Sequence, residues 1–169
     1  GLGDVYKRQV PFDVNIRENA AKTLEYAYAD FTIGQMAEKM GKDAIAKTYY
    51  EQSYRYKNVF DPSTNLMRGK NEDGTFQSPF DPLKWGGAFT EGNSLHYTWS
   101  VFQDIDGLIN LMGGKENFIK QLDGVFTMPP KYDASYYGKV IHEIREMEVA
   151  NMGNYAHGNQ PIQHMIYLY

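Results

Sequence analysis

The strongest constraint on the fold of this 169-residue chain is the alternation of short helical segments with long loops rich in proline and glycine. Residues 19–40 carry apolar side chains at nearly helical spacing, and Gly41 fits the end of a helix. Asp43 is expected to cap a second helix that runs from Ala44 to about residue 60. Two helices joined by so short a turn predict a helical hairpin.

A long loop is predicted next, because the segment from Asp61 to Gly92 contains the clusters DPSTN, NEDG, SPFDP and WGG. A loop of about 30 residues in a compact domain is more often functional than filler. We expect it to contain short strands or turns. Helical patterns then return, and the expected helices are 94–112, 115–126, about 135–148 and a last one after the Gly- and Asn-rich loop 151–160.

Helix pairs joined alternately by short and long loops predict stacked helical hairpins. We therefore expect an all-α fold, part of an α/α toroid, with long loops and minor β-hairpins at its rim. Residues 1–9 have no period and no cap, and we expect them to be translated adapter or vector sequence. Residues 10–169 are then expected to be a barrel domain truncated at both ends, since the C-terminal PIQHMIYLY begins a helix without a stop signal.

Composition narrows the class of protein. The net charge of −4 is a poor match for a nucleic-acid scaffold. The absence of cysteine excludes disulfides, thiolate zinc sites and cysteine nucleophiles. No apolar run approaches the ~20 residues of a membrane helix. Aromatic residues reach 15% of the chain, which weakly favours sugar binding and is equally compatible with an aromatic core.

The first candidate for chemistry is Glu91, in Thr-Glu-Gly-Asn at a junction between a loop and a helix. Aromatic residues lie nearby in the sequence, and a carboxyl group among aromatic side chains can hold a proton near neutrality. One interpretation is a general acid in a sugar site. The other, which the pattern alone favours, is a glutamate in the first turn of a helix that complements the helix dipole.

Two further clusters are candidates. His142-Glu143 with Glu146 forms HExxE, which lacks the second histidine of a zinc protease motif, so that class is rejected. A charged, solvated helix face explains the same pattern. Around Asn159, amide and imidazole side chains in a glycine-containing loop suit hydroxyl recognition or an oxygen-coordinated cation, and loop capping explains them as well.

Four segments together resemble glycoside hydrolase family 92: KTLEYAYADFTIGQMAEKMGK, YKNVFDPSTNLMRGKNEDG, WGGAFTEGNSLHYTWSVFQDIDGLINLMGG and YAHGNQPIQHMIYLY. The ordered occurrence of TEGN, LMGG and GNQPIQH is specific, and the resemblance covers nearly all of residues 14–169. The family comprises exo-acting, calcium-dependent α-mannosidases that invert the anomeric centre, with an N-terminal β-sandwich and an (α/α)6 barrel. The resemblance implies that this chain is the middle of the barrel.

The resemblance also implies roles for individual residues. Glu91 matches the general acid, and His142-Glu143 matches a pair that contacts the leaving-group sugar in α-1,2-specific members. Glu146 and Asn159 fall in regions that contribute to the calcium and mannose subsites. Many relatives have glutamate where this chain has Gln160, which weakens a ligand role there. Trp85 and Asn93, beside the acid, are expected to bind substrate.

Several properties follow for the full-length protein. The substrate would be a mannose-containing glycan, as in N-glycan degradation, with Ca²⁺ as cofactor and no nucleic-acid partner or membrane span. A secreted, periplasmic or cell-surface location is implied. The general base, an Asp further toward the C-terminus, and the β-sandwich lie outside this chain, so the chain alone is expected to be inactive. The alternatives are a carbohydrate-binding α/α module with tryptophan platforms, or a structural helical-repeat module.

Overall fold

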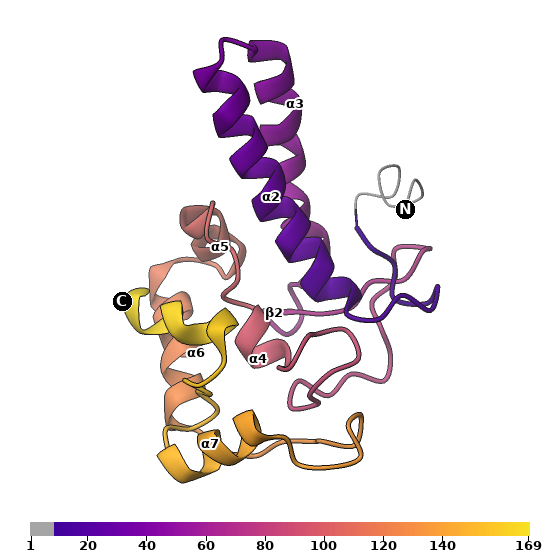
Figure 1. Ribbon diagram of the computed structural model, residues 1–169. Helices are drawn as coiled ribbons and strands as arrows, with labels where there is room; N and C mark the ends of the chain where they lie inside the picture. Colours follow the sequence, from indigo (N-terminus) through magenta and orange to yellow (C-terminus); the bar gives the residue numbers. More distant parts are fainter. Residues whose placement is uncertain (1–8) are drawn as a thin grey trace.

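The computed structural model describes residues 9–169 and is rich in helix (Figure 1). Except for Gln9, the segment expected to be non-native lies outside the described residues. The predicted helical hairpin is confirmed as α2 (Asn19–Lys39) and α3 (Asp43–Ser53), which project together from the rest of the chain. The expectation that Asp43 caps α3 is wrong. The N-cap position belongs to Lys42, and Asp43 is already in the first turn.

The two helices of the hairpin pack through small residues. Ala27, Gly34 and Ala37 are buried on α2, and the ring of Tyr50 on α3 lies directly against Gly34. A small-residue face allows the helix axes to approach closely. Four of the larger apolar side chains of α2 are instead exposed: Tyr26, Tyr28, Ile33 and Met36.

The chain continues into a 3₁₀ helix, η1 (Tyr54–Val59), and then into two short strands. Strands β1 (Phe60–Asp61) and β2 (Leu66–Met67) pair antiparallel, with Phe60 opposite Met67. The remainder of the segment up to residue 92 is irregular apart from isolated bridges. The prediction of a long loop with short strands is therefore confirmed.

The helix expected over 94–112 is wrong, because the structure divides it into α4 (Ser94–Tyr97) and α5 (Ile105–Leu111). The Asp104 carboxylate accepts the Gly107 N–H and so begins a new helix. Helix α6 (Lys115–Thr127) follows as predicted.

The last two helical segments also differ from expectation. Helix α7 (His142–Ala150) does not begin near residue 135, since residues up to 141 form turns and extended chain. The final helical segment is a 3₁₀ helix, η2 (Gln160–Tyr167), with proline in its first turn.

One continuous core joins all of these elements except α3. Its largest fully buried side chains come from η1, the long loop, the segment between α4 and α5, α6 and the C-terminal part, and they include Tyr56, Trp85, Trp99, Phe118 and Tyr155. In residues 9–169, no helix has the length and apolar character needed to cross a membrane.

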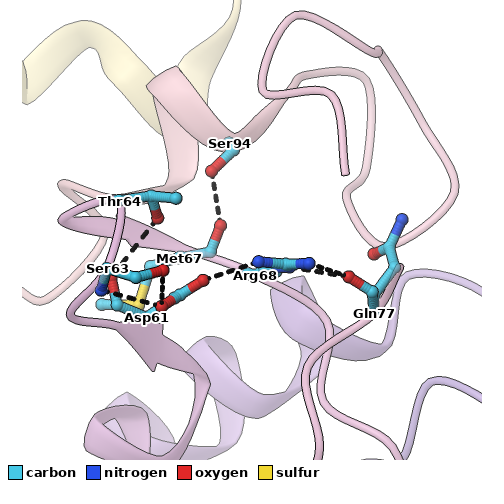
Figure 2. Close-up of polar contacts among 7 residues, drawn as sticks. All are labelled: Asp61, Ser63, Thr64, Met67, Arg68, Gln77 and Ser94. Carbon is cyan, nitrogen blue, oxygen red and sulfur yellow. Dashed lines mark hydrogen bonds and ion pairs between the residues drawn. The ribbon is translucent and has the colours of Figure 1, made fainter. Parts of the chain in front are cut away.

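A buried polar network fixes the β-hairpin beneath α4 (Figure 2). The Arg68 guanidinium forms a 2.8 Å ion pair with Asp61 and donates to the Gln77 carbonyl oxygen. Ser94, the first residue of α4, donates to the Met67 carbonyl oxygen. Burial acts to raise the pKa of Asp61, but hydrogen bonds from Ser63 and Arg68 outweigh it, so the pKa of this carboxyl is lowered. Asp61 therefore stays ionised, and the hairpin is held under the loop that follows it.

Candidate active site

Glu91 is an exposed loop residue with left-handed backbone geometry, φ 46°. It lies before Asn93, which is the N-cap of α4, so it is outside the first turn of that helix. The structure therefore contradicts the interpretation of Glu91 as a first-turn glutamate. Left-handed geometry is unfavourable for a residue with a Cβ and persists only where surrounding contacts enforce it.

Two side chains from distant segments hold the backbone of Glu91. The Glu91 N–H donates to the phenol oxygen of Tyr137 at 3.1 Å. The Asn159 amide donates to the Glu91 carbonyl oxygen. These partners are 46 and 68 residues away in the sequence. Both peptide groups beside the Glu91 Cα are thus fixed from outside the loop.

The rest of the loop from Trp85 to Asn93 is fixed by main-chain hydrogen bonds. The Gly86 N–H donates to the Gly92 carbonyl oxygen at 2.9 Å and closes the loop on itself. The carbonyl oxygen of Ala88 accepts from two N–H groups in the first turn of α2, those of Ala20 and Ala21. The Glu91 carboxylate is therefore carried by a loop whose main chain is hydrogen-bonded within itself and to α2.

His96 joins this loop to the loop before η2. Its Nδ1 accepts the Asn93 N–H at 3.1 Å, which assigns the ring proton to Nε2, and Nε2 donates to the Asn154 carbonyl oxygen at 2.6 Å. Complete burial lowers the pKa of His96 to about 4, although the bond to Asn154 opposes the shift. His96 is consequently neutral at physiological pH and acts as a fixed connector.

Trp85, one of the aromatic residues near Glu91 in the sequence, lies beneath the loop. Trp85 is 0% exposed and packs edge-on against the His96 ring, with centroids 4.8 Å apart. Asn93 is also fully buried, and its side-chain oxygen accepts the His96 N–H. Trp85 and Asn93 therefore support the loop from below, and the expectation that they contact substrate directly conflicts with their burial.

Tyr137 is the aromatic residue that sequence reasoning missed. We expected it inside a helix, but it is in a turn, with its N–H donating to the Ala134 carbonyl oxygen. Burial raises the pKa of Tyr137 to about 12. A surface hollow of about 640 Å³ adjoins it, lined by Arg17, Glu18, Lys22, Tyr136 and Tyr137.

At the beginning of α7, the Nε2 atom of His142 lies 3.2 Å from the Glu143 carboxylate. The His142 side chain is 77% exposed, whereas that of Glu143 is 9% exposed. Of these two side chains, only the His142 imidazole is accessible to a ligand. A purely solvated charged face does not describe the buried Glu143.

Glu146 lies against Gly158, the residue that precedes Asn159 in the sequence. The Glu146 carboxylate lies where a Cβ on Gly158 would be, immediately before Asn159. Calcium takes six to eight oxygen ligands. Within residues 9–169 no group of three or more acidic or histidine side chains is placed to hold a metal. These two residues do not form a calcium site on their own.

Comparison with known proteins identifies the family of this chain. Residues 5–169 match the model of the glycosyl hydrolase family 92 catalytic domain, and the chain belongs to this family. The match begins within the segment we expected to be non-native. A protein from Arthroderma benhamiae described as an uncharacterized secreted glycosidase is 27% identical over 126 residues, which are 61% of this chain and 16% of that protein.

Solved structures from Bacteroides thetaiotaomicron are similar over nearly the whole chain. A family 92 inverting mannosidase is 50% identical, with a TM-score of 0.81 over 98% of this chain. A family 92 α-mannosidase is 37% identical, with a TM-score of 0.78 over 96% of this chain. The same enzyme in complex with mannoimidazole gives a TM-score of 0.80 at 36% identity over 98% of this chain. This chain spans 22%, 20% and 22% of those three chains, respectively.

Proposed function

We propose that the full-length protein is an inverting exo-α-mannosidase in which Glu91 is the general acid. The observation that carries the proposal is the placement of Glu91. It is exposed on a loop whose backbone is held from both sides, by Tyr137 and by Asn159. Family membership and the similarity to two mannosidases support the reaction class. In the full-length protein, the helices of this chain would form part of an (α/α)6 toroid.

Inversion requires two carboxyl groups about 6.5–9.5 Å apart, with a water molecule at the second. Glu91 would protonate the glycosidic oxygen as the bond to the leaving sugar breaks. Asp104 is an unsuitable base because its carboxylate already accepts from the Tyr56 hydroxyl at 2.6 Å and caps α5. The base would be an Asp located beyond residue 169. The substrate would be a mannose-containing glycan.

Calcium remains a proposal for the full-length protein. Glu146 and Asn159 would supply a minority of its oxygen ligands, and the others would come from outside this chain. A secreted, periplasmic or cell-surface location is likewise proposed, supported by the fungal relative described as secreted. A carbohydrate-binding module with tryptophan platforms finds no support, since Trp85 and Trp99 are at most 1% exposed.

We propose that His142 and Glu143 set the preference for an α-1,2 linkage. The exposed imidazole would contact the leaving sugar, and the buried Glu143 would orient the imidazole. His142→Ala should raise KM for α-1,2-mannobiose and leave KM for an aryl mannoside unchanged. Steady-state kinetics on the two substrates would measure this. Equal changes on both would assign the pair a structural role.

The proposed function is tested by hydrolysis of α-1,2-mannobiose by the full-length protein. Glu91→Gln should lower kcat by about 10²–10⁴-fold, because it removes the proton donor while keeping the shape of the side chain. Glu116→Gln, an exposed glutamate in the first turn of α6, is the matched control and should retain wild-type turnover. Wild-type turnover in Glu91→Gln would contradict the proposal.

A further inference from the structure

The turn that carries Tyr137 is attached to the same loop that carries Glu91. The Trp85 N–H donates to the Asp133 carbonyl oxygen at 2.9 Å, and the Asp133 N–H donates to the Leu83 carbonyl oxygen at 2.9 Å. The two segments therefore pair in parallel at Lys84 and Asp133. The Asp133 carboxylate accepts the Ser135 N–H at 2.8 Å and shapes the turn. The position of the Tyr137 ring is thus fixed relative to the loop 85–93.

Tyr137 contacts Glu91 through a single polar atom at a strained position. The Glu91 N–H donates to the Tyr137 phenol oxygen at 3.1 Å, and Glu91 has φ 46°. Because Asn159 holds the peptide group on the other side of the Glu91 Cα, rotation of Glu91 into the common right-handed region would have to turn one of the two held peptide groups and break its hydrogen bond. The phenol oxygen therefore favours the backbone geometry that sets the direction of the Glu91 side chain.

Neighbouring groups do not provide the same restraint. Tyr136 is 40% exposed, packs edge-on against the Tyr137 ring at 5.1 Å, and forms no described hydrogen bond to the loop. Asn159 acts on the other side of Glu91, at the carbonyl oxygen. Among residues 9–169, only Tyr137 holds the Glu91 N–H.

We propose that Tyr137 is a positioning residue for the general acid, acting by holding the Glu91 backbone in its left-handed conformation. The inference rests on the proposed function, since it requires Glu91 to be the acid. It assigns Tyr137 no contact with the reacting atoms. The effect of Tyr137 on turnover must therefore pass through the Glu91 carboxyl group.

The test is a double-mutant cycle in the full-length protein, with Tyr137→Phe, Glu91→Gln and both together. On α-1,2-mannobiose, Tyr137→Phe should lower kcat about tenfold with KM unchanged, the size expected for one lost hydrogen bond. In the Glu91→Gln background it should cause no further loss. Tyr136→Phe is the matched control and should match the wild type on this substrate.

The outcomes separate the inference from the proposed function. If Glu91→Gln keeps wild-type turnover, the proposed function fails, and this inference fails with it. If Glu91→Gln is impaired but Tyr137→Phe is not, or if the two losses multiply, only the positioning role is overturned. If Tyr137→Phe unfolds at a lower temperature than the wild type, its kcat on an aryl mannoside with an activated leaving group, which needs little protonation, separates a positioning role from lost stability. The loss should then be at least about threefold smaller than on α-1,2-mannobiose, and equal losses on the two substrates would overturn the role.

Discussion

The α2–α3 hairpin and the loop 85–93 are built in opposite ways. The hairpin is held by contacts between two helices that are adjacent in the sequence, and it projects away from the other elements (Figure 1). The loop has almost no regular structure, and the groups that fix Glu91 come from Tyr137 and Asn159. Local order thus supplies the scaffold, whereas the geometry of the candidate acid depends on residues far away in the chain.

The largest structural effect is expected where the loop after α7 packs against the C-terminal part of α6. A Cβ on Gly153, which has φ 66°, would overlap the main-chain carbonyl oxygen of Val125. Gly153→Ala should therefore destabilise the protein by about 3 kcal/mol, from overpacking plus the left-handed geometry. Gly41, in the turn of the hairpin, has φ 67° with nothing within 4 Å of an added Cβ.

Gly41→Ala is the matched control, with an expected cost of about 1 kcal/mol from backbone geometry alone. Urea unfolding of both variants measures the difference. Equal costs would show that the packing around Gly153 is looser than described.

The pH dependence of stability tests the second region, where His96 joins the loop 85–93 to the loop before η2. The pKa of His96 is lowered to about 4 in the folded protein from 6.5, so the unfolded chain binds its proton first as the pH falls. Stability from His96 is complete above pH 6.5 and decreases towards pH 4. From pH 7.5 to 5 the wild type should lose about 2 kcal/mol more than His96→Gln, as measured by urea unfolding. Parallel pH profiles would contradict a buried neutral histidine.

The smallest effect concerns the exposed face of the hairpin. Met36 is 66% exposed in this chain, and the proposed toroid would cover it in the full-length protein. Met36→Gln in the full-length protein should then cost about 1–2 kcal/mol, through lost burial of apolar area. Lys39→Gln, in the last turn of the same helix, should stay within about 0.5 kcal/mol. Equal, small changes in thermal unfolding would mean that this face stays open to solvent.

The sequence predicted the locally determined elements correctly and missed the contacts between distant segments. Periodicity and the short turn at Gly41 were sufficient for the hairpin and for α6, because those elements are determined locally. The helix expected over 94–112 was wrong because Asp104 begins a new helix, and its partner Tyr56 lies 48 residues away. Trp85, near Glu91 in the sequence, was expected to bind substrate, but it belongs to the core.

The candidate acid was found through its motif, whereas its supports were missed. Tyr137 gave no signal, since a tyrosine in a turn contributes no periodicity. Asn159 was singled out as a possible calcium ligand, but the structure shows it donating to the Glu91 carbonyl oxygen. Hydrogen bonds between segments 46 and 68 residues apart leave no local pattern to read.

The most direct test of Glu91 as the general acid is the dependence of the Glu91→Gln defect on the leaving group. A sugar leaving group needs protonation, whereas an activated aryl leaving group needs little. The ratio of wild-type to Glu91→Gln kcat should be about 10²–10⁴ on α-1,2-mannobiose and at least about tenfold smaller on a dinitrophenyl mannoside. Equal ratios on the two substrates would contradict the acid role.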